Sequence, residues 1–273
     1  MKTTTADYQY RIHCIRIVPN IGTPVYITDH PRSILISGNL YSSDYGYEFT
    51  GQDESTAMNA GVIDLSGIIG LSGITYAKIA SGVFDNARVY VFATTWTNPI
   101  EDEEELGIAI FGRTELRDQR HQVEMMMLID ALGQTVGINF TPGCQKKYGG
   151  TEFAGCKSTP TVVTGTITHV TNNYTFRDSN RTQAFDFFGE GFIGITSGSN
   201  ATTEPLEIKS YAADGSIVLH SAFHYPVTVG STYSMTSGCR RNLAACIGKN
   251  NVVNFGGFSF VPTEAIYSQT GSR

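Results

Sequence analysis

The chain has 273 residues, a length that suggests two domains or one large one. Its 19 lysines and arginines against 25 aspartates and glutamates give a net charge of −6, which argues against a protein that mainly clamps nucleic-acid phosphates. Hydrophobic residues make up 41% of the sequence, so the chain can build an ordinary core and is not disordered throughout.

Charged residues are scarce, at 16% against about 25% in typical soluble domains. A surface with few charges is typical of a subunit in a larger assembly, because the centres of interfaces are depleted in charge. No stretch approaches the ~18–20 apolar residues of a membrane span. The N-terminus lacks the apolar core of a secretory signal peptide, so we expect synthesis in the cytoplasm.

The first half of the chain is rich in β-branched and aromatic residues, interrupted by turn residues such as Pro19-Asn20. The acidic run at 101–105 is expected to form an exposed hairpin tip rather than a cation site. The methionines at 125–127 are expected to fill the core, and the apolar, glycine-rich stretch at 62–74 to form a contact surface. We predict strands at 8–19, 23–28, 33–37, 46–50, 87–95, 106–116 and 122–129, and a short helix at 75–81.

The composition changes near Phe140, and four of the five cysteines follow. We therefore predict a mainly β protein with a few short helices and two β-rich domains, residues 1–140 and 141–273. Residues 262–273 are expected to form an exposed strap. In the second domain we predict strands at 161–170, 183–188, 192–196, 206–212, 217–220 and 227–229, and a short helix at 240–247 near the last two cysteines.

The four cysteines of the second half are the strongest chemical signal in the sequence. Cys144 and Cys156 are separated by 11 residues, and Cys239 and Cys246 follow 82 residues later, separated by six. Two disulfides are disfavoured without a secretory signal, and zinc usually takes closer pairs of cysteines. An iron–sulfur cluster tolerates thiolates from separated loops. The spacing alone leaves zinc and iron–sulfur open, whereas the isolated Cys14 is expected to be a buried small apolar residue.

Basic residues surround these cysteines, and no aspartate or glutamate lies within three positions of any of them. A positive field stabilises thiolates and anionic metal–thiolate centres, whereas neutral disulfides need none. The charge pattern therefore favours metal binding. The basic residues are Lys146, Lys147, Lys157, Arg240, Arg241 and Lys249.

Several segments, in order along most of the chain, resemble the family of phage tail hub and tail tip proteins, which includes the tail tip protein of phage lambda and the hub protein of gene transfer agents. In the second half these are FTPGC at 140–144, GCK at 155–157, GCRR at 238–241 with Cys246, and NNVVNFGGF at 250–258 with Pro262. In the first half they are ITDHPR at 27–32 and FDNARVYVF at 84–92 with Trp96.

The resemblance implies an N-terminal hub domain and a C-terminal domain with a [4Fe–4S] cluster held by Cys144, Cys156, Cys239 and Cys246. It implies a homotrimer at the tip of a long non-contractile tail, assembled in the host cytoplasm. The expected partners are the distal tail protein ring, the central tip or fibre protein and the tape measure protein, with no recognition of nucleic acid sequence. Gly256 and Gly257 are expected to allow a tight backbone turn beside the cluster, with Phe255 and Phe258 shielding it.

The alternatives are a tail-associated enzyme, such as a cell-wall hydrolase, and a zinc-stabilised receptor-binding module. His13 and Cys14 face opposite sides of a strand and cannot form a catalytic dyad. For Asp29 and His30 a turn capped by the aspartate is favoured over an acid–base pair. We therefore expect no enzyme activity. A catalytic cysteine would need a histidine as its base, and the candidates are His13, His30, His121, His169, His220 and His224.

Overall fold

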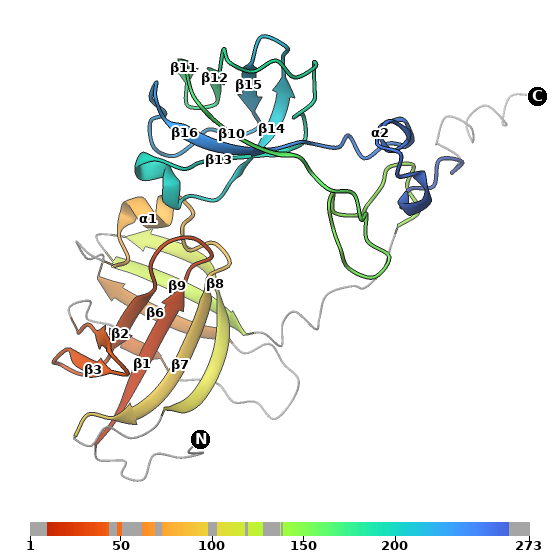
Figure 1. Cartoon of the computed structure of the whole chain (residues 1–273). Coiled ribbons are helices and arrows are strands. Elements are labelled where there is room, and N and C mark those ends of the chain that lie inside the picture. Colours follow the sequence, from red (N-terminus) through yellow and green to blue (C-terminus); the bar gives the residue numbers. More distant parts are fainter. Residues whose placement is uncertain are drawn as a thin grey trace, which may run out of the picture. The chain divides into compact units, whose positions relative to one another are not determined.

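The computed structural model describes residues 10–43, 48–50, 62–68, 73–97, 103–117, 120–127, 137 and 139–261 (Figure 1). The chain divides into two compact units, residues 1–135 and 136–273. The described residues form sixteen strands, two α-helices and short 3-10 turns, so the predicted mainly β class is confirmed. The domain boundary at residues 140 and 141 stays a prediction.

The first unit contains a seven-stranded sheet in which every neighbouring pair is antiparallel. A separate hairpin is formed by β3 (Ile34–Ile36) and β4 (Asn39–Tyr41). In spatial order the sheet strands are β2 (Val25–Thr28), β1 (Arg11–Val18), β7 (Arg88–Thr95), β8 (Glu104–Arg117), β9 (Arg120–Met127), β6 (Val62–Ile68) and β5 (Glu48–Thr50).

Strand β1 is buried on both faces, because neighbouring residues of a strand point to opposite sides. Ile15 and Ile17 join the main core with residues of β2, β7, β8 and β9. Ile12 and Cys14 pack on the other side with Ile36 and Tyr41 of the small hairpin. The β1 strand therefore lies between two apolar layers, and Cys14 is buried as predicted.

Helix α1 (Tyr76–Ala80) follows the predicted helix at 75–81 closely. Its start is fixed by Thr75, whose hydroxyl accepts a hydrogen bond from the backbone N–H of Lys78 at 3.2 Å. It ends before Gly82, whose φ of +73° is the left-handed conformation in which glycine is favoured. Local capping signals therefore define the two ends of this helix, and Ile79 packs it against the main core.

Two predictions for the first unit are wrong in detail. The acidic run does not form only a hairpin tip, because β8 begins at Glu104, whose side chain is largely buried and lies 3.7 Å from Arg11. Of the methionine run, Met125 is fully buried in the core but Met126 is 45% exposed. Part of the stretch at 62–74 forms strand β6, and the rest includes residues outside the described part of the chain.

The second unit also contains a seven-stranded sheet with antiparallel neighbours. Buried side chains from five of its strands share one core that includes Tyr211 and Tyr233, and Val163 and Val170 of the other two strands pack against it, so the sheet covers a single apolar interior. In spatial order the strands are β10 (Val162–Thr166), β16 (Thr232–Thr236), β13 (Phe192–Ile195), β14 (Leu206–Tyr211), β15 (Ser216–Leu219), β12 (Thr175–Arg177) and β11 (His169–Asn172).

The second unit departs from the sequence prediction at several places, and its strands β12 and β16 were not predicted. The segments at 183–188 and 227–229 are not strands, and the predicted strand at 161–170 is divided into β10 and β11. Helix α2 (Leu243–Gly248) begins after Asn242, whose side chain accepts from the backbone N–H of Ala245 at 2.8 Å. The predicted strap at 262–273 lies outside the described residues.

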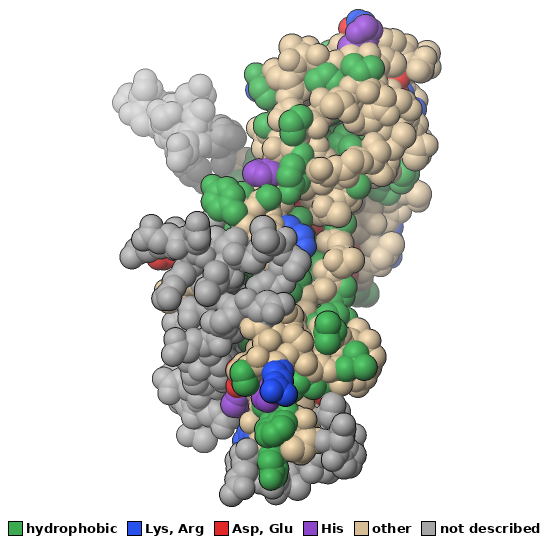
Figure 2. All heavy atoms as spheres, turned by 90° about the vertical axis from the view of Figure 1, so that its left-hand side faces the viewer, with side chains coloured by type: hydrophobic (Ala, Val, Ile, Leu, Met, Phe, Trp, Pro, Cys, Tyr) green, Lys and Arg blue, Asp and Glu red, His purple; other side chains and the backbone are tan. Residues whose placement is uncertain are grey.

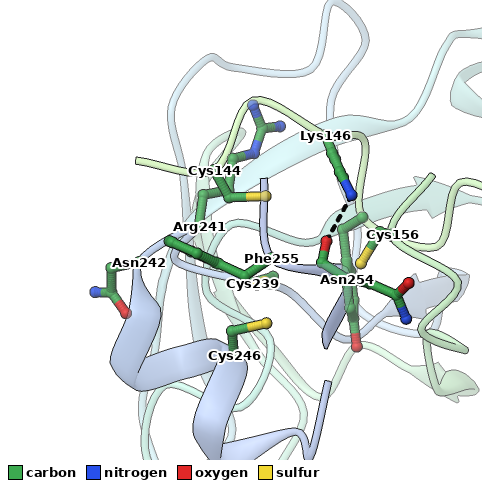
Figure 3. A pocket seen from close by; sticks show the side chains of 10 residues that line it. Cys144, Lys146, Cys156, Cys239, Arg241, Asn242, Cys246, Asn254 and Phe255 are labelled. Carbon is green, nitrogen blue, oxygen red and sulfur yellow. Dashed lines mark hydrogen bonds between the residues drawn. The ribbon is translucent and has the colours of Figure 1, made fainter. Parts of the chain in front are cut away.

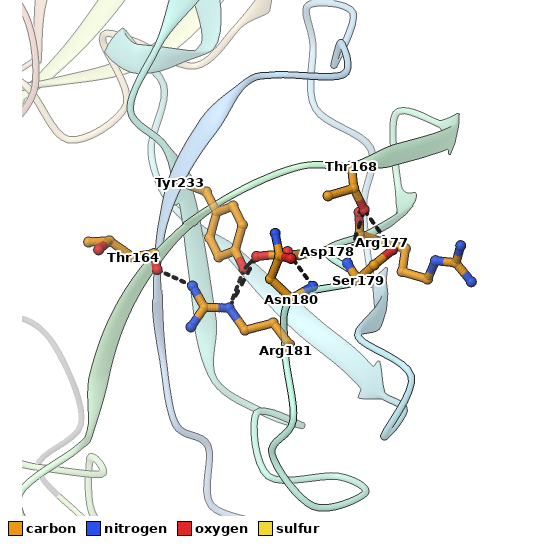
Figure 4. Close-up of polar contacts among 8 residues, drawn as sticks. All are labelled: Thr164, Thr168, Arg177, Asp178, Ser179, Asn180, Arg181 and Tyr233. Carbon is orange, nitrogen blue, oxygen red and sulfur yellow. Dashed lines mark hydrogen bonds and ion pairs between the residues drawn. The ribbon is translucent and has the colours of Figure 1, made fainter.

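A buried polar network joins the edge strand β10 and its neighbour β16 to a loop (Figure 4). The Tyr233 hydroxyl donates to Asp178 Oδ2 at 2.7 Å and accepts from Arg181 Nε at 2.7 Å. Arg181 also donates to the carbonyl oxygen of Thr164 in β10. The network satisfies a buried carboxylate and fixes the loop against β10 and β16.

Candidate metal centre

Two segments that flank the second sheet in sequence come together as one loop-rich region, residues 139–160 and 238–261, which we call the cysteine module. All four predicted cysteines line one pocket there, with an empty volume of ≈ 310 Å³ that includes the part open to solvent (Figure 3). The remaining lining residues are Lys146, Tyr148, Arg241, Asn242, Asn254 and Phe255.

Ordinary local structure positions each cysteine. Cys144 and Cys156 lie in the irregular segment before β10, and Cys239 comes three residues after the end of β16. Cys246 lies on α2 and is buried. The helix predicted at 240–247 begins three residues later than expected, after its N-cap Asn242, and Cys239 lies outside it.

Backbone and side-chain hydrogen bonds tie the two halves of the cysteine module together. The Cys144 backbone N–H donates to the Arg241 carbonyl oxygen at 2.6 Å. At the far end of the module, the Phe258 N–H donates to the Thr141 carbonyl oxygen at 2.8 Å. Lys146 Nζ donates to the Asn254 carbonyl oxygen, also at 2.8 Å (Figure 3). The pocket is therefore built by both segments.

Nitrogen donors approach two of the four sulfur atoms. The Gly256 backbone N–H donates to Cys144 Sγ at 3.3 Å, and the Asn251 side-chain amide donates to Cys156 Sγ at 3.4 Å. The Cys246 thiol donates to the Asn251 carbonyl oxygen at 3.1 Å. Donors aimed at sulfur are the outer-shell contacts that stabilise thiolates bound to a metal. The sequence prediction missed Asn251 as a partner of the site.

Glycines allow the close approach of backbone that these contacts require. A Cβ atom on Gly257 would lie 2.7 Å from the Pro142 carbonyl oxygen, and one on Gly256 would lie 2.8 Å from the Lys146 side chain. Neither glycine has a positive φ, so they are needed for space rather than for the tight turn that we predicted. Phe255 lines the pocket as expected, but Phe258 packs on Phe140, with ring centroids 4.5 Å apart.

The electrostatic surroundings of the pocket are positive, but less so than the sequence suggests. Lys146 and Arg241 line the pocket, and Lys249 lies 4.8 Å from the centre of the Tyr148 ring. Arg240 instead forms a two-pronged ion pair with Asp186, with N–O distances of 2.7 and 2.8 Å. Its charge is therefore paired with a turn of the same unit.

The four thiols lie near enough to influence one another. Burial raises the pKa of the Cys246 thiol, and the thiols of Cys156, Cys144 and Cys239 raise it further, whereas Lys146 lowers it. Four thiolates in one pocket repel each other unless a cation binds them. The groups around the pocket suit an anionic metal–thiolate centre. Four sulfurs can bind the metal, two nitrogen donors can hydrogen-bond to the sulfurs, and two cationic side chains can offset the negative charge. Within the described residues, no three His, Cys, Asp or Glu side chains converge on a point suited to one metal ion.

The other candidate residues do not join the cysteine module. Cys14 lies in the core of the first unit, where burial raises its pKa to about 12, so its thiol stays protonated at neutral pH. Asp29 bonds to His13 rather than to its neighbour, accepting from the His13 N–H at 2.9 Å and contacting Nδ1 at 2.8 Å. His30 stacks on Trp96. No histidine of the described residues lines the cysteine pocket.

Helices of the described part of the chain are all too short or too polar to cross a lipid bilayer. A search among curated proteins gave no significant match. One solved structure with the same fold is a chain in the virion of the native gene transfer agent particle. It aligns over 94% of this chain and 90% of that chain, with a TM-score of 0.82 and 19% identity.

Two family profiles match the sequence. A conserved phage protein family, named BR0599 and without an assigned function, covers residues 186–265 and includes Cys239 and Cys246. The profile of the baseplate hub protein, N-terminal attachment domain, covers residues 4–158, more than half of the chain. The resemblance to phage tail hub proteins is thereby confirmed at the level of the family, and the chain belongs to the baseplate hub proteins, structural components of phage tails and baseplates.

Proposed function

We propose that the chain is the trimeric hub at the tip of a long non-contractile phage tail, with a C-terminal unit stabilised by a [4Fe–4S] cluster. In this role it joins the distal tail protein ring to the central tip or fibre protein, contacts the tape measure protein, and performs no catalysis. Membership of the baseplate hub family supports the structural role. The family match does not identify the partners or the cluster, which are parts of the proposal.

The observation that carries the cluster is the gathering of four cysteines around one pocket from segments that are 82 residues apart. When bound, the cluster would act as a covalent cross-link between the two segments. Cys144, Cys156, Cys239 and Cys246 would each supply one thiolate, and Lys146 and Arg241 would offset the negative charge. Four protein thiolates leave no open position for a substrate, which supports a structural centre.

A cross-link of this kind would convert binding energy into folding energy. The cysteine module has few strands or helices of its own, only α2 and a 3-10 turn, η4 (Val252–Asn254), among its described residues. Its exposed side chains include Phe153 and Val253, which are 101% and 98% accessible. A region with so little buried apolar surface needs another source of stability, and the cluster would provide it.

The first experiment is purification of the full chain without air, followed by iron, sulfide and zinc analysis and an absorption spectrum. We expect a brown protein with about four irons per chain. One zinc and no colour would replace the cluster with a zinc site. Metal-free protein without free thiols would indicate disulfides and would overturn the metal centre.

Single substitutions then test the ligand set. Cys239→Ser and Cys246→Ser are expected to lose the iron and the fold of the second unit, while the first unit stays folded, because each removes one of four thiolates. Cys14→Ser is the matched control and should keep the iron, because Cys14 is buried elsewhere. Iron content and limited proteolysis of each variant provide the comparison, and equal iron in Cys14→Ser and Cys239→Ser would disprove the assignment.

A further inference from the structure

Asn251 is the one side chain of the described cysteine module that donates a hydrogen bond to a cysteine sulfur. It lies between α2 and η4, beside Cys246 in the fold, and its amide reaches across to Cys156 in the other segment. The Asn251 Nδ2 atom is 2.6 Å from the Cys156 carbonyl oxygen and 3.4 Å from Cys156 Sγ. One amide therefore contacts both the backbone and the sulfur of a cysteine 95 positions away.

The orientation of this amide is fixed by its partners. A carbonyl oxygen can only accept, so the Asn251 nitrogen must face Cys156. Its oxygen then faces the other way, where Asn254 Nδ2 donates to it at 2.7 Å. The contact of Asn254 completes a short chain of hydrogen bonds that ends at the Cys156 sulfur. The N–H of Asn251 cannot turn away from the sulfur without losing two bonds.

The backbone of the same residue holds the other nearby cysteine. The Asn251 N–H donates to the Cys246 carbonyl oxygen at 3.0 Å, a bond that does not depend on the thiol proton that Cys246 loses when it binds a metal. Asn251 therefore bonds to Cys156 through its side chain and to Cys246 through its backbone, and so holds the two cysteines at a fixed separation. No other residue of the described module contacts these two cysteines with hydrogen bonds in this way.

We infer that Asn251 is the positioning residue of the metal centre: its amide fixes Cys156 relative to Cys246 and donates an N–H···S bond to the Cys156 thiolate. This inference rests on the proposed cysteine-bound cluster. An N–H donor stabilises negative charge on sulfur, and it does so more strongly when the charge increases. The N–H···S bond from Asn251 should therefore slow metal release. It should also raise the reduction potential of a bound cluster, because reduction adds an electron and the bond favours the more negative state.

The test compares substitutions in the full-length, iron-loaded protein. Asn251→Asp keeps the size of the side chain and the acceptor for Asn254, but replaces the donor with an oxygen. We expect it to release iron to excess chelator about ten times faster, or more, than the wild-type protein, as outer-shell substitutions typically do. Its reduction potential, measured by titration in the visible range, should shift to more negative values.

Asn250→Asp is the matched control, because it adds the same charge at the neighbouring position. Asn250 is exposed and has a φ of +52°, which aspartate tolerates. Its iron release and its potential should stay close to those of the wild-type protein. Asn254→Ala provides a second variant that leaves the Asn251 donor in place and removes only its orienting partner. We expect a smaller change in the same direction.

The outcomes separate this inference from the proposed function. Wild-type protein without metal would overturn both. Iron-loaded wild-type protein with unchanged release rate and potential in Asn251→Asp would overturn the inference alone. An equal shift of potential in Asn250→Asp would also overturn it, because added charge rather than the lost N–H···S bond would then be the cause.

Discussion

The Tyr233 hydroxyl is fully enclosed in the second unit, where it both donates to Asp178 and accepts from Arg181. Burial raises the pKa of Tyr233, and the hydrogen bond to Asp178 raises it further. The phenol thus remains neutral while it satisfies the Asp178 carboxylate. Removal of the hydroxyl would leave that carboxylate short of one donor inside the protein.

Tyr233→Phe is therefore expected to destabilise the second unit by about 1–3 kcal/mol, the usual cost of leaving a buried polar group unsatisfied. Urea unfolding followed by fluorescence or circular dichroism measures this change. Tyr174→Phe is a suitable control, because Tyr174 is 46% exposed, and it should stay within about 0.5 kcal/mol of the wild-type stability. Similar losses in both variants would argue against a special role of the network.

Cys14 gives the first unit a dependence on alkaline pH. Burial is the main cause that raises its pKa from 9.0 to about 12. Below pH 9 the Cys14 thiol is protonated in both the folded and the unfolded chain, so its ionisation does not lower the free energy of unfolding, and the stabilising contribution of the neutral thiol is fully present. Between pH 9 and 12 the unfolded chain loses the proton that the folded chain keeps, so stability falls as the pH rises.

We expect the wild-type first unit to lose about 1 kcal/mol more stability between pH 8 and pH 10 than a Cys14→Ala variant does. The comparison of the two proteins cancels the titration of groups that they share. Hydrogen exchange of the β1 amides at each pH reports the stability of this unit. Equal losses in both proteins would show that Cys14 ionises near its ordinary pKa in the folded state.

At the scale of the elements, the sequence predicted best where local patterns decide the structure. Strand β7 and helix α1 were predicted within one or two residues, because alternation and capping are local. The apolar, glycine-rich stretch at 62–74 was predicted as a contact surface and not as a strand, but its residues 62–68 form strand β6, which pairs with β5 and β9. Its partners are more than ten residues away, and no local pattern indicates them.

The wrong strand at 183–188 has a similar cause. Its aromatic residues suggest a strand, but Asp186 adopts a left-handed φ of +61°. Arg240, 54 positions later, holds the Asp186 carboxylate with two hydrogen bonds. A turn that depends on a distant ion pair cannot be recognised from local sequence. The same limit applies to the metal centre. The four cysteines and the basic residues near them indicated the pocket, but nothing local indicated the contact of the Asn251 amide.

Gly238 is the first residue of the second segment of the cysteine module and lies two residues after the end of β16. A Cβ atom there would collide with the Gly189 carbonyl oxygen and lie 2.5 Å from the Gly191 nitrogen. The backbone of these three glycines therefore packs without room for a side chain, directly before Cys239. This packing aligns the end of the strand with the pocket.

Gly238→Ala is expected to destabilise the second unit by about 1–3 kcal/mol, the typical cost of overpacking, and to lower its iron content by displacing Cys239. Thermal unfolding and iron analysis test both effects. Gly248→Ala is the control in the same unit, because a Cβ there meets no atom within 4 Å. The prediction would be wrong if the two variants matched in stability and iron.

At the scale of the whole molecule, the charges are divided unequally between the two units. Residues 1–135 contain 17 acidic and 9 basic residues, whereas residues 136–273 contain 8 and 10. Charged side chains are sparse on the face of the described residues that Figure 2 shows. Surfaces of this kind suit contacts with other subunits better than permanent exposure to solvent.

The proposed hub role leads to an expected threefold arrangement in the particle. A closed ring covers apolar surface and exposed strand edges by symmetric contacts. We expect a reconstruction of the tail tip to contain three copies of the chain per tail, even if the isolated chain stays monomeric. One copy or six copies per tail would contradict the trimer while leaving the family assignment intact.

The position of the cysteines at both ends of the second sheet has a mechanical consequence. Cys156 precedes β10 and Cys239 follows β16, so the entire sheet lies in the 82-residue loop between them. With the proposed cluster in place, tension along the backbone would pass through metal–sulfur bonds and bypass the strands. The loop would hold back roughly 270–300 Å of extended chain until those bonds break. Such a unit would transmit a pulling force along the tail without itself becoming longer.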